Sequence, residues 1–322
     1  MVELQEKLRG VVADVLQKEK LSYVIGYQAA SFGVGTRPLF IRSKEDVKKL
    51  VFSPLCSANL VRYLKYRKPE QSVGVIVKGC DSRAVVQLLQ ESGVDRDKVK
   101  LIGVSCAGVA EAEKVQNMLP EGSSFELVGY DDKKLDFVVD NKKISVNRSE
   151  VSAERCSCCE YKTPVIYDVL VGEKLEAARK NTYSEVKDFE KHSLEERWEF
   201  WAAEFEKCIR CYACRNACPL CYCPQCMAEL LEPQWLLRSV DGAECGAWNI
   251  MRAMHLAGRC IGCGECERAC PVDIPLMLLN KKLEKSCLSR FDHKAGLDPK
   301  GKPVLAAFNP NDPEEFVMSG EC

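Results

Sequence analysis

The sequence predicts a chain of two parts, an α/β domain with a partly parallel sheet followed by a helical domain rich in cysteine. Short apolar runs alternate with amphipathic segments in the first half. Of the 20 cysteines among the 322 residues, only three precede residue 156, and most of the others fall in the second half. The predicted divisions are an α/β domain, a linker with a docking helix, a cysteine-rich domain and a C-terminal tail, at 1–170, 171–206, 207–285 and 286–322.

The composition excludes several classes of protein. Lys and Arg number 46 and Asp and Glu number 47, so the formal net charge is -1. This balance argues against nucleic-acid binding and against a basic membrane-surface face. No apolar stretch approaches the ~18 residues of a membrane span, and the N-terminus lacks the order of a signal peptide. We expect a cytoplasmic protein, whose reduced thiols favour metal ligation over disulfides.

The elements of the α/β domain follow one another along the chain. Residues 4–20 carry leucine and valine at helical spacing, and Ser43 is a candidate N-cap of a second helix. The apolar run 73–77 is followed by an amphipathic helix that Gly93 would end, and then by a second apolar run that reaches Cys106. Strand, helix and strand in this order predict a parallel βαβ unit.

Four cysteines are expected at one edge of this sheet. Cys80 and Cys106 follow the carboxyl ends of two parallel strands, where ligands gather in such sheets. Residues 125–146 are rich in strand signals and precede a C-x2-C pair, Cys156 and Cys159. Together the four thiols match the ligand number of a [4Fe–4S] cluster. The alternative is that Cys80 and Cys106 are small buried hydrophobic residues.

The linker is polar, charged and free of cysteine. In its second half Leu194, Trp198, Trp201 and Phe205 recur at helical spacing after acidic residues. This pattern predicts an amphipathic helix that docks on the cysteine-rich domain. The tryptophans also suit a partner surface, but packing within the chain explains them equally well.

The strongest motif of the chain occurs twice. The spacing C-x2-C-x2-C-x3-C-P begins at Cys208 and again at Cys260. This is the run of bacterial two-cluster ferredoxins, in which the fourth cysteine ligates the other cluster. The predicted ligand sets are Cys208, Cys211, Cys214 and Cys270 for one [4Fe–4S] cluster, and Cys260, Cys263, Cys266 and Cys218 for the other. A zinc ribbon, the alternative, requires neither the third cysteine nor the proline.

The segment between the two runs is long for a minimal ferredoxin. Residues 227–240 and 248–258 both carry a helical pattern, which favours the α-helical ferredoxin type of multisubunit redox enzymes. Four arginines flank the ligands, and nearby cations raise the potential of an anionic cluster; they are Arg210, Arg215, Arg259 and Arg268. The alternative for these arginines is an ordinary solvated face.

Three more cysteines come directly after the first run. Cys221, Cys223 and Cys226 fall within six residues, and Cys245 is a candidate fourth ligand. They are interpreted as ligands of a further cluster or of zinc. Alternatively, this thiol-rich loop lines the neighbouring cluster.

Taken in order, several segments resemble one family: VKGCDSRAVV, IGVSCAG, ERCSCCE, and the run from CIRCYACRNACPLCYCPQC to CIGCGECERACPVDIP. Over roughly residues 70–280 the chain resembles the β subunits of deazaflavin-dependent hydrogenases and formate dehydrogenases of anaerobes. The resemblance implies an α/β domain with FAD and a [4Fe–4S] cluster, which would fall on Cys80, Cys106, Cys156 and Cys159. It also implies a ferredoxin part that relays electrons to a partner subunit.

Two features differ from the family pattern. A Cys-Gly-Gly segment is absent near the start of the sequence, and Lys78-Gly79-Cys80-Asp81 stands where Lys-Pro-Cys-Asp is typical. The shortened form looks like the iron–sulfur subunits of heterodisulfide-reductase-like, hydrogenase or formate dehydrogenase assemblies. We therefore predict an electron-transfer subunit with at least three [4Fe–4S] clusters and with no catalytic residue of its own. One alternative is a FAD-dependent subunit that itself reduces or oxidises a deazaflavin, and another is a zinc scaffold without redox function.

Overall fold

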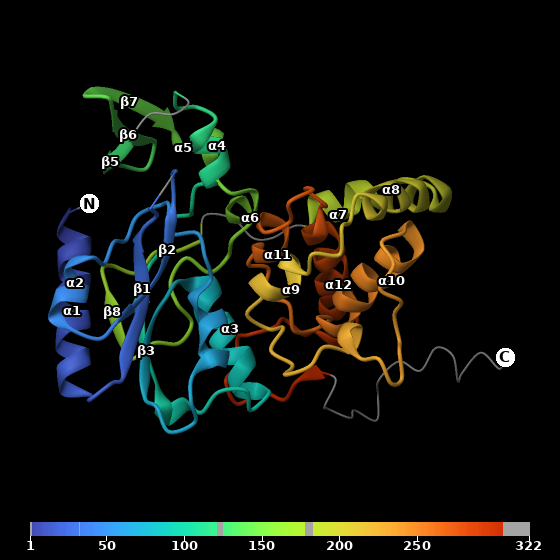
Figure 1. Ribbon diagram of the computed structural model, residues 1–322, viewed down its shortest axis with the longest axis horizontal. Coiled ribbons are helices and arrows are strands. Elements are labelled where there is room, and N and C mark those ends of the chain that lie inside the picture. The colour runs from blue at the N-terminus through green and yellow to red at the C-terminus, as the bar shows by residue number, and fades with distance from the viewer. Residues whose placement is uncertain (1, 32, 121–124, 178–182, 305–322) are drawn as a thin grey trace. The chain divides into compact units, whose positions relative to one another are not determined.

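The computed structural model describes residues 2–31, 33–120, 125–177 and 183–304. The chain divides into two compact units (Figure 1), one of Met1–Val85 with Ser92–Thr182 and one of Val86–Glu91 with Tyr183–Cys322. The helices and strands that begin in the first unit are α1 (Val2–Lys18), β1 (Tyr23–Ala29), β2 (Thr36–Ile41), α2 (Lys44–Lys48), β3 (Val73–Val77), α3 (Gly79–Gln90), β4 (Val99–Val104), α4 (Ala112–Gln116), β5 (Phe125–Tyr130), β6 (Lys134–Val139), β7 (Lys142–Asn147), α5 (Arg148–Val151), α6 (Glu154–Ser157) and β8 (Val169–Val171). Those of the second unit are α7 (Ser184–Phe189), α8 (Leu194–Glu206), α9 (Ala213–Ala217), α10 (Gly242–His255), α11 (Glu265–Arg268) and α12 (Leu276–Phe291).

A five-stranded mixed sheet forms the centre of the first unit. Its order is β2-β1-β3-β4-β8, with β1 and β2 antiparallel and the other neighbours parallel. All five residues of β3 are buried, as expected for a parallel strand that is covered on both faces. In Figure 1, α1 lies on one face of the sheet and the first turns of α3 lie on the other. The α/β character and the partly parallel sheet predicted from the sequence are confirmed.

Local sequence signals explain several of these elements. Leu8 and Val12 on α1 are fully buried, so the apolar stripe of residues 4–20 does form the packed face of a helix. Ser43 caps α2, and its hydroxyl oxygen accepts a hydrogen bond from the Asp46 amide at 3.3 Å. The predicted βαβ unit is β3-α3-β4, in which Val73 lies opposite Val99.

Gly79, the residue that differs from the family pattern, lies where another part of the chain approaches closely. A Cβ atom at this position would lie 1.6 Å from the Tyr161 carbonyl oxygen. No side chain fits there without a backbone shift. The glycine lets the segment that follows Cys159 pass directly over the start of α3.

A smaller antiparallel sheet, β5-β6-β7, confirms the strand signals of residues 125–146. Leu135, Phe137 and Val139 alternate along β6 and are buried in their own apolar cluster. This alternation is the pattern of a strand with one covered face.

The second unit is helical. Its predicted amphipathic helix is α8, which starts with a capping box between Ser193 and Glu196. Phe205 is buried and packs against Gly246 of α10, whereas Trp198 is 70% exposed. None of the helices in the described residues combines the length and apolarity of a membrane span.

One helix predicted in the cysteine-rich domain is wrong. Of residues 227–240, only Met227–Glu229 form a short 3-10 helix. Pro233 has no amide hydrogen for a helix, and α10 begins only after Asp241, whose side chain accepts from the Glu244 amide. Near the C-terminus, α12 continues without interruption across the predicted domain boundary between residues 285 and 286. The part of the predicted tail after residue 304 lies outside the described residues.

Candidate metal centres

The two cysteine runs adopt the same backbone shape. Five residues separate the first cysteine of each run from the third. The second and the fourth of these five residues have a left-handed backbone conformation in both loops. Arg210 and Tyr212 have φ of 53° and 59°, and Gly262 and Gly264 have φ of 67° and 70°. Glycine adopts this conformation readily, whereas arginine and tyrosine do so at a cost of roughly 1–3 kcal/mol each.

The first loop offsets this strain with side-chain contacts. Arg210 is buried and donates to the Glu244 carbonyl oxygen at 3.2 Å and to the Tyr212 hydroxyl at 3.0 Å. The Tyr212 ring packs edge-on against Trp248 of α10, with a centroid separation of 5.0 Å. The segment between the two runs therefore supports the first ligand loop.

Three cysteines of the first predicted set belong to one apolar cluster. Cys214 is buried on α9, and Cys208 and Cys270 are half-buried beside the same core. Burial raises the pKa of the Cys214 thiol, the Arg252 charge lowers it, and charge on Cys208 and Cys270 raises it. These three thiols are thus within electrostatic range of one another. Cys211, the fourth of the set, is exposed.

All four cysteines of the second predicted set line one pocket. Two polar side chains join them there, and the polar and thiol lining is Cys218, Arg252, Cys260, Cys263, Cys266 and Asn280. The side-chain amide nitrogen of Asn280 donates to the Cys266 sulfur at 3.5 Å. The structure therefore places Cys218 beside the second loop, although its sequence run belongs to the first.

The thiols of this pocket differ in acidity. A hydrogen bond from the Cys221 thiol lowers the pKa of Cys218 to about 6, against the effect of burial. Burial raises the pKa of Cys260 to about 12 and that of Cys266 to about 11, and it raises that of Cys263 well above its ordinary value. Metal binding must therefore displace protons from three of the four thiols.

The four cysteines expected at the sheet edge are also brought together. Burial raises the pKa of Cys80 well above its ordinary value, and charge on Cys106 and Cys159 raises it further. Burial likewise raises the pKa of Cys106 to about 11, with contributions from Cys156 and Cys159. The Val109 amide donates to the Cys156 sulfur at 3.5 Å. The alternative of two isolated hydrophobic cysteines does not describe this grouping.

A buried polar network lies beside the sheet edge. Lys78 is 2% exposed, and its Nζ lies 3.1 Å from the carboxylate of Asp81, which is fully buried. The same Nζ donates to the Tyr27 hydroxyl and, at 3.0 Å, to the Ala58 carbonyl oxygen. The sequence shows Lys78 only as part of a motif, because an apolar strand gives no sign of a buried ion pair at its end.

The third cysteine group is not gathered in the same way. Cys221 donates to Cys218, Cys223 is exposed, and Cys226 packs beside the apolar cluster of Cys214. Within the described residues, no three Cys, His, Asp or Glu side chains are placed to hold a single metal ion. A metal site at Cys221, Cys223 and Cys226, with or without Cys245, stays a prediction.

The flanking arginines lie beside carboxylates. The pairs and their shortest N–O distances are Arg210–Glu244 at 3.9 Å, Arg215–Glu229 at 2.9 Å, Arg259–Glu91 at 2.5 Å and Arg268–Glu265 at 2.5 Å. Arg252, which no sequence motif singles out, is the arginine that lines the four-cysteine pocket. Its spacing of four residues from Trp248, on the buried face of α10, is the signal that marks it as an inward-facing cation.

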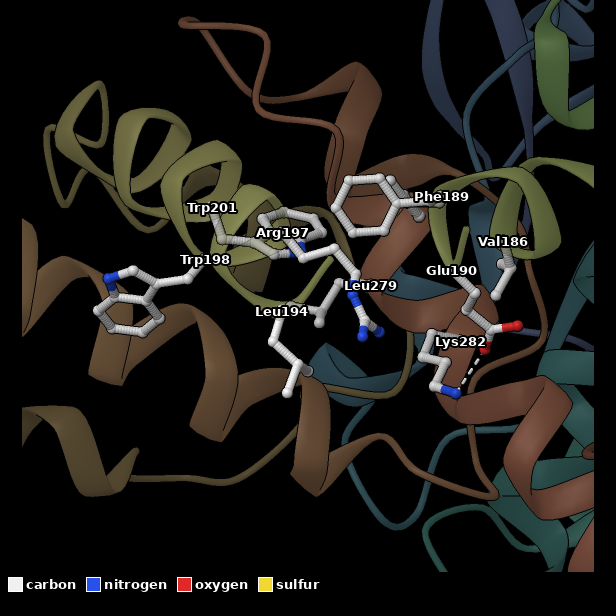
Figure 2. A pocket seen from close by; sticks show the side chains of 10 residues that line it. Val186, Phe189, Glu190, Leu194, Arg197, Trp198, Trp201, Leu279 and Lys282 are labelled. Carbon is white, nitrogen blue, oxygen red and sulfur yellow. Dashed lines mark hydrogen bonds and ion pairs between the residues drawn. The ribbon is translucent and has the colours of Figure 1, made fainter. Parts of the chain in front are cut away.

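A separate apolar pocket of about 260 Å³ lies among α7, α8 and α12. Figure 2 shows Glu190 and Lys282 joined at one end of it and Trp198 at the other. Trp201, on the same helix as Trp198, stacks on Phe205. Packing within the unit thus accounts for Trp201, and Trp198 is left exposed.

Comparisons with known proteins match two separate segments of the chain. Residues 70–186 match the family described as the C terminus of the coenzyme F420 hydrogenase/dehydrogenase beta subunit, and residues 207–275 match a "4Fe-4S dicluster domain". A chain from Methanocaldococcus jannaschii, "F420-dependent formate dehydrogenase subunit beta", is 24% identical over 83% of this chain and 85% of its own length. "F420-dependent formate dehydrogenase 1 subunit beta" of Methanococcus maripaludis is 23% identical over 85% and 86%, respectively.

A solved structure with a similar chain is also known. It is a xenon-derivatised F420-reducing [NiFe] hydrogenase complex from Methanosarcina barkeri, with a TM-score of 0.40 and 16% identity over 50% of this chain and 62% of that chain. The iron–sulfur electron-transfer function predicted from the sequence is confirmed at the level of the matched domains. The chain carries the C-terminal domain of coenzyme F420 hydrogenase and dehydrogenase beta subunits together with a 4Fe-4S dicluster domain, as its resemblance to that family predicted.

Proposed function

We propose that the chain is a cytoplasmic subunit that relays electrons through at least three [4Fe–4S] clusters within a formate dehydrogenase, hydrogenase or heterodisulfide-reductase-like complex. The observation that most supports this proposal is the pocket that Cys218, from one cysteine run, lines together with three cysteines of the other run. This is the exchange of fourth ligands that a two-cluster ferredoxin requires. The names of the two relatives favour a formate dehydrogenase as the partner enzyme.

The residues present fit such clusters. Beside the four thiols of the pocket, the Nε of buried Arg252 lacks a hydrogen-bond partner among the described residues. Buried polar groups in native proteins are normally paired, so an unmatched donor among thiols indicates an absent acceptor. A bound [4Fe–4S] cluster accepts and donates one electron, and the protein sets its potential through charge, hydrogen bonds and burial.

Metal and sulfide analysis tests this function. The chain, purified without oxygen, should contain about twelve irons and as much acid-labile sulfide, since three clusters of four irons are proposed. The variant Cys218→Ala should lose about four irons, and it should lose the same EPR signal as Cys263→Ala. Cys287→Ala is the matched control, because this buried thiol belongs to none of the proposed sets. Zinc without sulfide would overturn the proposal. If Cys218→Ala instead loses the EPR signal that Cys211→Ala loses, the exchange of fourth ligands is overturned.

A second function is supported by the names of the relatives, which are F420-dependent enzymes. In this alternative the chain binds FAD and itself reduces or oxidises a deazaflavin. Acid extraction of the same preparation separates the two functions. Flavin in a one-to-one ratio with the chain would favour this alternative, whereas about twelve irons without flavin would favour the relay.

A further inference from the structure

Arg252 is a buried cation that no carboxylate in the described chain pairs with. Its side chain lies on α10, in the segment that separates the two cysteine runs, and it is 4% exposed. Nη2 donates to the Cys214 carbonyl oxygen at 3.1 Å, and Nε has no hydrogen-bond partner among the described residues. An isolated charge in a protein interior is costly unless an opposite charge compensates it.

Thiols of both predicted ligand sets surround this guanidinium. Burial lowers the pKa of Arg252, but charge on Cys266, Cys218 and Cys214 more than offsets this and raises it. Cys218 and Cys266 line the pocket that Arg252 also lines, and Cys214 belongs to the neighbouring set. One cation is therefore placed between the two sets, in contrast to the flanking arginines, which carboxylates already neutralise.

We propose that Arg252 is the shared counter-ion of the two clusters of the dicluster domain, and that it raises the reduction potential of both. This inference rests on the proposed function. Clusters bound by four thiolates are net negative, so a nearby fixed cation favours the more negative, reduced form. Arginine suits this position because its guanidinium stays charged and is weakly hydrated, so it tolerates burial.

The test is a pair of variants of the full chain, Arg252→Met and Arg252→Lys, followed by redox titration with EPR detection. In Arg252→Met the equilibrium constant for reduction should fall at least tenfold at both clusters, which is about 59 mV for one electron. In Arg252→Lys, which keeps the charge, both potentials should shift by less than half as much. Arg215→Met is the matched control, because the carboxylate of Glu229, 2.9 Å away, already compensates the charge of Arg215.

The outcomes separate this inference from the proposed function. Unchanged potentials in Arg252→Met would overturn it, and so would a shift at one cluster alone or an equal shift in Arg215→Met. If Arg252→Met loses both clusters, their retention in Arg252→Lys supports the counter-ion, and their loss in both variants overturns it in favour of a packing role. A wild-type chain without iron and sulfide would instead overturn the proposed function itself.

Discussion

Replacing Lys78 with methionine should destabilise the first unit severely. The change removes one partner of a buried ion pair, the ammonium group that lies 3.1 Å from the fully buried carboxylate of Asp81. It also removes the donor to the Tyr27 hydroxyl and to the Ala58 carbonyl oxygen. Methionine fills a similar volume, so packing alone predicts a small effect.

The magnitude follows from the geometry. At the observed N–O distance of 3.1 Å, and with an effective dielectric constant of about 20, the attraction is about 5 kcal/mol. Breaking a buried pair from one side typically costs about 3–5 kcal/mol. We expect a loss in this range in the opening free energy of the β3 amides, measured by hydrogen exchange with mass spectrometry. Exchange is preferred to a global melt because a chain of two units need not unfold in one step.

Two further variants make this prediction refutable. Lys78→Met with Asp81→Asn should cost clearly less than the sum of the single changes, because the double variant lacks both charges of the ion pair. Lys48→Met is the control, since Lys48 and Glu45 form an exposed pair worth less than about 1 kcal/mol. A loss below about 1 kcal/mol in Lys78→Met, or strict additivity with Asp81→Asn, would refute a buried ion pair as the source of stability.

Three other predictions concern stability. Phe137→Ala should cost about 3–5 kcal/mol in the opening free energy of the small sheet, because the ring is 1% exposed. Ser193→Ala should cost about 1 kcal/mol in the first turn of α8, where its hydroxyl oxygen caps the helix. Hydrogen bonds from Lys282 and Lys285 lower the pKa of Glu190 to about 2. The Glu190 carboxylate therefore stabilises the fold at pH values above its unfolded pKa of about 4.3, and this stabilisation is lost as the pH falls toward 2. Glu190→Gln should remove this pH dependence, which amounts to less than about 1 kcal/mol in the free energy of unfolding.

Each of these has its own contrary result. Unchanged exchange in β6 of Phe137→Ala would mean that the small sheet has no core of its own. Protection lost evenly along α8 in Ser193→Ala would point to packing rather than capping. For Glu190→Gln, a loss of stability that is the same at pH 7 and at pH 2 would exclude the carboxylate charge as the cause.

Sequence patterns predicted the regular parts of the fold because each rests on local interactions. Apolar periodicity found α1, and the hydroxyl of Ser43 marked the start of α2. The helix expected over 227–240 failed for the same kind of reason. Its apolar spacing suits a helix, but Pro233 interrupts the hydrogen-bond ladder, and the cap that starts a helix is Asp241.

The spacing of the cysteines predicts the candidate metal ligands and nothing else of the candidate site. The spacing motif includes all of its cysteines, so Cys218 and Cys270 are predicted as ligands together with the loops that precede them. Groups that act through the tertiary structure leave a weaker trace. Arg252 belongs to neither cysteine run, although it comes shortly before Cys260, and the ion pair of Lys78 forms only when the end of β3 is packed.

The difference between the two ligand loops has a consequence for the order of maturation. Gly262 and Gly264 take their left-handed conformations freely, so we expect the second loop to reach its final backbone shape before the rest of the unit has packed. Arg210 and Tyr212 are stabilised by contacts with α10, so we expect the first loop to reach its final backbone shape only after that helix has packed against it. Iron should therefore load first at Cys260, Cys263 and Cys266. During timed reconstitution of the apo-chain, the earliest EPR signal should disappear in Cys266→Ala and persist in Cys214→Ala.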